Sequence, residues 1–189
     1  MLTHYRMSQR NIKQSSLIAN VFFVTLKTIK GVRIFTNEKY FNVLLNSLLY
    51  CQKHKGLKLY AYCLLVNHLH LVFSTESNHP EKFLQDFKRF TTTQIHKVLK
   101  ESQRLDDLNK LSYSAINRKN TDFRLWQRAV FPEEIFTQKF LEQKIKYTDF
   151  NPTHHQVVSD IEHYPYTSYH NHYCAHKNFL SVLQIPSIL

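Results

Sequence analysis

The sequence predicts an α+β fold in which one antiparallel sheet is covered by helices. Strand-like segments rich in β-branched and aromatic residues alternate with helical ones in the order strand, helix, strand, strand, helix, strand. Hydrophobic residues make up 43% of the 189 residues, which is enough for one sizeable core. No internal repeat divides the chain. The order is that of the split βαβ, or ferredoxin-like, pattern, and we expect its helices to pack on one face of the sheet.

The first half of the chain supplies three of the expected strands. Residues 20–28 form the first, and a turn leads on to residues 33–35. Residues 38–53 form a helix, because apolar side chains recur there at helical spacing: Phe41, Leu44, Leu45, Leu48 and Leu49. Residues 57–65 and 68–74 then form two strands joined by a tight turn.

The second half supplies two long helices and the last strand. Residues 80–100 form a helix with an apolar side and several lysines elsewhere. Residues 101–122 are polar without apolar periodicity, so we expect an extended connection. Residues 123–130 are the expected last strand, and residues 132–150 a helix stopped by Pro152.

Two histidines, His68 and His70, lie in the strand-like run at residues 60–73, YAYCLLVNHLHLVF. Successive strand side chains point to opposite faces, so both imidazoles emerge on one face while Leu69 and Leu71 take the other. Two imidazoles on one face can share a divalent ion, and two protein ligands suit an open, catalytic site that other groups complete. The alternative is that both are ordinary surface histidines of a half-buried strand.

Composition excludes several classes of function. Lysine and arginine total 25 against 14 aspartate and glutamate, and this net charge of +11 favours a polyanionic partner. With only Gly31 and Gly56, the chain has no glycine-rich phosphate-binding loop, so we expect no nucleotide cofactor. Three widely spaced cysteines without a Cys-x-x-Cys pair indicate a reducing cytoplasm rather than a disulfide framework.

We expect one domain without membrane association. No segment approaches the apolar length of a membrane span, and the N-terminus lacks the pattern of a secretory signal. The expected organisation is a basic N-terminal segment at residues 1–19, a single domain at 20–176 and a C-terminal tail at 177–189.

The last predicted helix carries a candidate nucleophile, Tyr147. It lies four residues after Gln143 and four before Asn151, so the three share one side of the helix. Ile145 points roughly opposite to Tyr147, at ~100° per residue. The tyrosine can therefore face away from that part of the core. The alternative is simple packing, since the chain has 11 tyrosines.

Four motifs, in order, resemble those of the single-tyrosine HUH (IS200-like) transposases, and especially of the REP-associated tyrosine transposases. Residues 60–73 are similar to the family's Tyr-Cys-Leu-Met-Pro-Asn-His-Val-His-Leu, and LWQR at residues 125–128 resembles Phe-Trp-Gln-Arg. YTDFNP at residues 147–152 resembles Tyr-Ile-x-x-Asn-Pro, and YPYTSY at residues 164–169 resembles Trp-Pro-Trp-Ser-Ser-Tyr. The resemblance spans about residues 20–170.

The resemblance implies a metal-dependent single-stranded DNA endonuclease and strand transferase that acts at hairpin or palindromic repeats in the bacterial cytoplasm, near the nucleoid. His68 and His70 would be the metal ligands, and Asn151 stands where related insertion-sequence transposases have a glutamine that completes the site. Tyr147 would be the nucleophile and form a 5′-phosphotyrosine. The implied cofactor is Mg²⁺ or Mn²⁺, although imidazole ligands in general favour transition metals. Relatives act as monomers or as homodimers that exchange the tyrosine helix, so either state is compatible.

The implied partner is single-stranded or hairpin DNA. Basic and aromatic side chains contact phosphates and stacked bases in such complexes. The candidates here are Tyr5, Arg6, Arg10, Lys13, Lys88, Arg89, Trp126 and Arg128. Each has a plainer interpretation, as part of a solvated tail, a cation that faces water, or, for the single tryptophan, a core residue.

Two other functions remain open. A domesticated hairpin-DNA-binding protein would keep the fold and charge without cutting, although it would need neither the histidine pair nor Tyr147. A replication-initiator or relaxase-like nickase uses similar chemistry but usually carries further domains. The chain also departs from the family pattern at residues 129–130, where Ala-Val replaces the usual glycine and aromatic residue, and at residues 132–134, where Pro-Glu-Glu replaces a segment that commonly contains histidine. A third departure is Val66, where proline is usual. The departures at residues 129–134 affect expected DNA contacts more than the chemistry.

Overall fold

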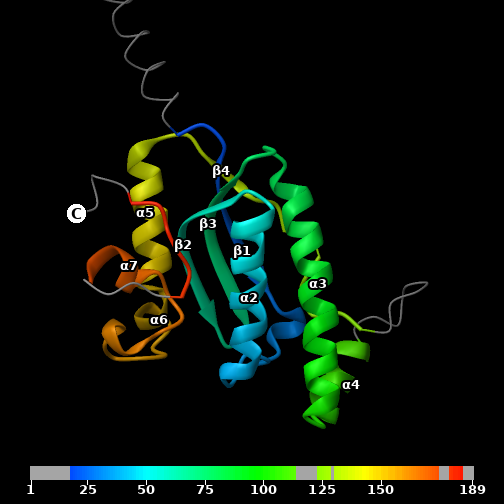
Figure 1. The fold of residues 1–189 in the computed structure, drawn as a ribbon. Helices are drawn as coiled ribbons and strands as arrows, with labels where there is room; N and C mark the ends of the chain where they lie inside the picture. Colours follow the sequence, from blue (N-terminus) through cyan, green and yellow to red (C-terminus); the bar gives the residue numbers. More distant parts are fainter. Residues whose placement is uncertain (1–17, 114–122, 129, 175–178, 185–189) are drawn as a thin grey trace, which may run out of the picture.

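The computed structural model describes residues 18–113, 123–128, 130–174 and 179–184, and contains a four-stranded sheet of order β2-β3-β1-β4 (Figure 1). The strands are β1 (Val21–Lys27), β2 (Leu57–Leu65), β3 (His68–Thr75) and β4 (Glu133–Ile135). All neighbouring strands are antiparallel. Because β3 lies between β1 and β2, which a helix connects, the structure confirms the ferredoxin-like split βαβ fold.

Six α-helices and two 3₁₀ turns accompany the sheet in the described residues. The helices are α2 (Glu38–His54), α3 (Pro80–Glu101), α4 (Leu105–Tyr113), α5 (Gln138–Asp149), α6 (Asn151–His154) and α7 (Tyr169–Tyr173). The 3₁₀ turns are η1 (Ile29–Gly31) and η2 (Ile161–His163). Within the described ranges, no helix has the length and apolar character needed to cross a membrane.

The two faces of the sheet carry separate cores. On one face, α2 and α3 pack over side chains such as Val24 and Leu71, and both helices lie in front of the sheet in Figure 1. On the other face, Leu141 and Ile145 of α5 pack against a second cluster that includes Phe23. The expectation that the helices share one face therefore holds for α2 and α3 and is wrong for α5. This division places α5 over the face that carries the histidines.

The first five predicted elements agree with β1, α2, β2, β3 and α3 to within one residue at each end. The connection after α3 differs, because residues 105–113 form α4 rather than extended chain. Leu108 and Leu111 of this helix are buried. Arg104 fixes the start of α4, since its guanidinium donates to the carbonyl oxygen of Ile34 at 3.1 Å and pairs with Asp107. Three leucines at a spacing of three in a nine-residue helix are too weak a pattern to predict from sequence.

The expected last strand at residues 123–130 was wrong, because the fourth strand is β4, further along the chain. Trp126 forms only an isolated bridge with Thr28, and β4 pairs with the start of β1. Pro132 lies between these two pairings and has no N–H for a sheet hydrogen bond, which accounts for the interruption. The following helix consequently begins later than expected, where the Thr137 side chain accepts a hydrogen bond from the Phe140 N–H at 3.2 Å.

Candidate active site

His68 and His70 lie side by side on the face of β3 that α5 covers. Their ring centroids are 4.9 Å apart and their planes nearly perpendicular, at 89°. Leu69 and Leu71 point into the core beneath α2 and α3. The structure therefore confirms that both imidazoles share one face, as the alternation of strand side chains predicts.

Each histidine uses its Nδ1 atom in a hydrogen bond to a neighbouring side chain. His68 Nδ1 donates to Asn67 Oδ1 at 2.7 Å, and His70 Nδ1 shares a hydrogen bond of 2.8 Å with Thr25 Oγ1. Thr25 is the partner of His70 in the β1–β3 register. His70 Nε2 is buried without a hydrogen-bond partner in the described part of the chain. Such contacts at Nδ1 fix the ring orientation and leave Nε2 as the nitrogen that could bind a metal ion.

Both imidazoles are neutral at physiological pH. Burial lowers the pKa of His68 to about 4, and the neighbouring His155 adds to the fall. Burial likewise lowers the pKa of His70 to about 3, followed by the effects of His68 and His155. Lys27, opposite His68 in the register, contributes a smaller lowering to both. A neutral imidazole keeps the lone pair that a metal ion needs. The surroundings therefore hold both histidines in the form that can bind a metal ion rather than in the protonated form.

Helix α5 brings Tyr147 to the histidines within the same chain. The Tyr147 ring lies 5.4 Å from the His70 ring and 6.0 Å from the Phe23 ring, edge-on to both. The side chain is 40% exposed, so it contacts the site and also solvent. Leu141 and Ile145 hold the opposite side of α5 against the sheet. The helix thus presents the phenol beside His70, with part of the ring open to solvent.

Asn151, the first residue of α6, lies beside the two histidines. Its side chain is fully buried, and neither amide atom has a hydrogen-bond partner among the described residues. It is close enough to both imidazoles to oppose the lowering of their pKa values. A buried polar atom without a partner is costly, and a bound ion or water would satisfy it. The residues therefore fit a divalent ion that takes two imidazole nitrogens and an amide oxygen.

Within the described ranges, no group of three or more histidine, cysteine, aspartate or glutamate side chains is arranged to hold a metal ion. An ion at His68, His70 and Asn151 would accordingly keep several positions for water or phosphate oxygens.

Three neighbours of the site had not been expected from the sequence. Thr25 orients His70, and the Phe23 ring stacks on His70 with 5.8 Å between centroids. The His155 ring lies 5.3 Å from the His68 ring, at the end of α6. Alignment of β1 with β3 would have revealed the first two, whereas His155 lies beyond Pro152, where the sequence predicted that the helix stops.

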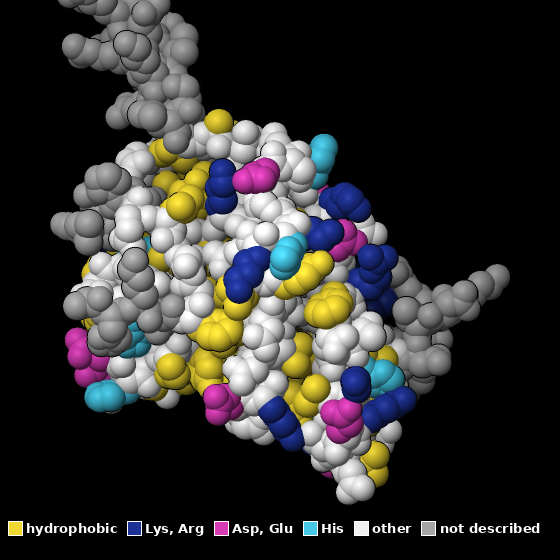
Figure 2. Space-filling view, viewed as in Figure 1, with side chains coloured by type: hydrophobic (Ala, Val, Ile, Leu, Met, Phe, Trp, Pro, Cys, Tyr) yellow, Lys and Arg dark blue, Asp and Glu magenta, His cyan; other side chains and the backbone are white. Residues whose placement is uncertain are grey.

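The DNA-contact candidates are scattered, and four of them lie outside the described residues: Tyr5, Arg6, Arg10 and Lys13. Lys88 Nζ donates to the Gln127 carbonyl oxygen at 2.8 Å, and burial lowers its pKa. Arg89 is exposed and pairs with Asp86 at 3.0 Å, and Arg128 is exposed. Figure 2 shows lysine and arginine side chains gathered over α3, which carries Lys88 and Arg89.

Trp126 lies in the core rather than at a surface. It is 2% exposed, and its indole N–H donates to Thr91 Oγ1 at 2.9 Å. Its ring also packs on Phe35, with 5.7 Å between centroids. The expected contact between Trp126 and DNA is therefore corrected, because no part of the indole is available to a base.

One known protein is similar to this chain in sequence, and one solved structure is similar to it in fold. A Haemophilus influenzae protein named "Putative REP-associated tyrosine transposase" is 25% identical over 118 residues, and the match covers 62% of this chain and 62% of that protein's length. A solved REP-associated tyrosine transposase bound to a REP hairpin has the same fold, with a TM-score of 0.59 at 14% identity over 82% of this chain and 80% of the other. No protein-family model matches the chain. These findings confirm that the chain resembles the REP-associated tyrosine transposases in sequence and in fold.

Proposed function

We propose that this protein is a metal-dependent single-stranded DNA endonuclease and strand transferase that acts at hairpin repeats. The observation that carries the proposal is the position of Tyr147, whose ring lies 5.4 Å from the ring of His70 within one chain. A nucleophile beside two neutral imidazoles suits attack on a phosphodiester. Because one chain supplies both parts of the site, a second copy is not required to complete it.

The proposed metal ligands are His68, His70 and Asn151, and the proposed ion is Mg²⁺ or Mn²⁺. The buried, unpaired His70 Nε2 and Asn151 amide atoms support this assignment. When bound, the ion polarises the scissile phosphate and offsets the charge that builds on its oxygens.

Tyr147 performs the bond exchange. Its phenolic oxygen forms a bond to phosphorus as the bond from phosphorus to the 3′-oxygen of the preceding nucleotide breaks. The phenolic proton passes to solvent, which the exposure of Tyr147 allows, and the departing oxygen takes a proton to become a 3′-hydroxyl. The product is a 5′-phosphotyrosine. A 3′-hydroxyl that attacks this ester restores a phosphodiester and frees Tyr147, so strands are joined without ATP.

Hairpin DNA is the proposed substrate, since the relative of the same fold was solved bound to a REP hairpin. The exposed cations of α3, which include Arg89 and Lys100, provide a surface for phosphates. The net charge of +11 favours association with such a polyanion.

The test uses purified protein, Mn²⁺ and a labelled hairpin with single-stranded flanks taken from repeats in the source genome. We expect a cleaved strand and a covalent DNA adduct that peptide mass spectrometry assigns to Tyr147. Tyr147→Phe should lose the adduct and keep hairpin binding, whereas Tyr50→Phe, at another exposed tyrosine, should retain both. Cleavage by Tyr147→Phe at the wild-type rate would contradict the assignment. Hairpin binding by the wild type without any adduct would instead identify a DNA-binding protein that does not cut.

A further inference from the structure

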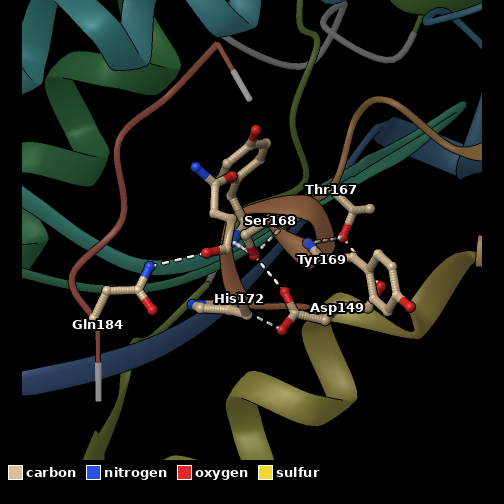
Figure 3. Close-up of polar contacts among 8 residues, drawn as sticks. Asp149, Thr167, Ser168, Tyr169, His172 and Gln184 are labelled. Carbon is tan, nitrogen blue, oxygen red and sulfur yellow. Dashed lines mark hydrogen bonds and ion pairs between the residues drawn. The ribbon is translucent and has the colours of Figure 1, made fainter. Parts of the chain in front are cut away.

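We propose that Asp149, Ser168 and His172 are positioning residues for Tyr147, an inference that rests on the function proposed above. The three form a buried polar cluster between the end of α5 and residues 167–172, a segment that begins just before α7 and runs into it (Figure 3). Asp149 comes two residues after Tyr147 and two before Asn151. Contacts that fix the position of Asp149 therefore also fix the positions of Tyr147, the proposed nucleophile, and Asn151, the proposed amide ligand.

The two carboxylate oxygens and the backbone carbonyl oxygen of Asp149 all accept hydrogen bonds from this segment. The Ser168 hydroxyl donates to Asp149 Oδ1, and His172 Nδ1 donates to Oδ2 at 2.7 Å. The Thr167 hydroxyl donates to the Asp149 backbone carbonyl at 3.0 Å. Both side chains of the pair are buried, Asp149 completely and His172 nearly so. A buried carboxylate that accepts charge-assisted hydrogen bonds from two sides has little freedom to move.

Ser168 extends the cluster to the sheet. Its backbone N–H donates to the Tyr62 carbonyl at 2.8 Å, and its hydroxyl accepts from the Tyr62 N–H at 2.9 Å. Tyr62 belongs to β2, whose next residue, Cys63, is the partner of His70 in the β2–β3 register. The cluster thus connects the helix of the proposed nucleophile to β2, the strand that pairs with the β3 strand of His68 and His70, through a short, buried path.

The cluster lies at the end of α5, where the C-cap residue Phe150 also packs on the rings of Tyr169 and Tyr173. Leu141 and Ile145 fix the earlier turns of the helix in the core. Near the end, the buried side chains Thr148 and Asp149 are polar, and Tyr147 is partly exposed. Polar contacts of Asp149 with Ser168 and His172 therefore hold the final turn together with the ring contacts of Phe150. The arrangement differs from a Ser-His-Asp catalytic triad, because here the aspartate lies between the serine and the histidine, and all three are buried away from solvent.

Displacement of the nucleophile lowers the rate of cleavage and leaves the affinity for substrate unchanged. Misplacement of a reacting group by ~1 Å can cost about 100-fold in rate. Cleavage at saturating hairpin DNA should therefore respond to this cluster, while hairpin affinity, which rests on other surfaces, should not.

The test compares three variants in single-turnover cleavage and in hairpin binding. His172→Leu removes the donor to Asp149 and should lower the saturating cleavage rate about 100-fold, with hairpin affinity within about twofold of wild type. His172→Asn restores an N–H donor near the position of Nδ1 and should recover most of the rate. The matched control is His170→Leu. His170 is buried in the same helix and contacts the Glu162 carbonyl instead, at 2.9 Å, so this variant should keep the wild-type rate even if its melting temperature falls.

A second measurement does not depend on cleavage. Fluorotyrosine at position 147 should give one ¹⁹F resonance, shifted by the rings of Phe23 and His70. His172→Leu should shift or broaden that resonance and His170→Leu should not; Ser168→Ala replaces His172→Leu if the latter fails to fold. An unchanged resonance together with a wild-type rate would overturn the inference. Absence of cleavage by the wild type would defeat the proposed function, and the fluorine measurement would still decide whether the cluster positions Tyr147.

Discussion

The ring of Tyr147 stands edge-on to the ring of His70, at 82° and 5.4 Å between centroids, although one residue belongs to α5 and the other to β3. The ring of Phe23, in β1, stacks on the ring of His70 with an angle of 13° between their planes. Residues of α5, β1 and β3 therefore meet at this point. Aromatic contacts of this kind are directional. The relative orientation of the proposed nucleophile and the proposed metal ligand is therefore set by packing within the chain.

Thr25→Val should weaken metal binding. The substitution keeps the shape and removes the hydroxyl that orients His70 Nδ1. Loss of such an outer partner typically lowers metal affinity about 10- to 100-fold, which calorimetric titration with Mn²⁺ would measure. Thr75→Val is the matched control on the same sheet, because Thr75 Oγ1 is buried without a partner in the described residues. Equal Mn²⁺ affinity in the two variants would contradict the role of Thr25.

Acid should destabilise the metal-free protein through His70. Burial is the main cause that lowers its folded-state pKa to about 3, below the unfolded value of about 6.5. Between these values the unfolded state binds more protons, so the free energy of unfolding falls as the pH falls from 6.5 toward 3. From pH 6.5 to 4.5 the loss should be about 2 kcal/mol. Urea unfolding in EDTA measures it, and His70→Gln should flatten the pH dependence; an identical slope in that variant would refute the assignment.

Trp126→Phe should cost stability and leave DNA binding intact. The change removes the hydrogen bond to Thr91 Oγ1 and part of the buried ring volume. We expect a loss of about 1 to 3 kcal/mol in the free energy of unfolding. Hairpin affinity at fixed salt should stay at the wild-type value. Arg128→Gln, two residues away and exposed, should show the opposite pattern. A lower hairpin affinity in Trp126→Phe with unchanged stability would mean that the indole does contact DNA.

Arg89→Gln should reduce the salt dependence of hairpin binding. If Arg89 contacts one phosphate, the slope of log affinity against log salt should fall in magnitude by about 0.9. Lys58→Gln removes the same charge from an exposed ion pair, Lys58 to Glu76, at the start of β2, and serves as the control. Equal slopes in the two variants would place the hairpin elsewhere on the surface.

The sequence predicted the elements whose patterns are local. Strand alternation in β3 correctly separated His68 and His70 from Leu69 and Leu71, and helical spacing placed Tyr147 opposite Ile145. These inferences needed only the geometry of one strand or one helix. The motif resemblance added Asn151, which the structure places beside both histidines.

What the sequence did not predict depends on contacts between distant segments. Thr25 and Phe23 matter only once β1 pairs with β3, and the Asp149–His172 pair joins two segments that share no periodicity. The last strand was misplaced because Phe123 and Trp126 have strand-like character but are buried by side-chain packing. Tertiary context overrode local propensity there.

The stretch around Tyr166 has a consequence for solubility. β2 is an outermost strand of the sheet, and an unpaired outermost strand of apolar residues can recruit a strand from another molecule. Here the N–H of Leu64 donates to the Tyr166 carbonyl, and that of Leu183 donates to the Leu59 carbonyl. The C-terminal chain thus shields β2 from intermolecular pairing. A version that ends before residue 164 would uncover this template and should aggregate, however intact its histidines and tyrosine.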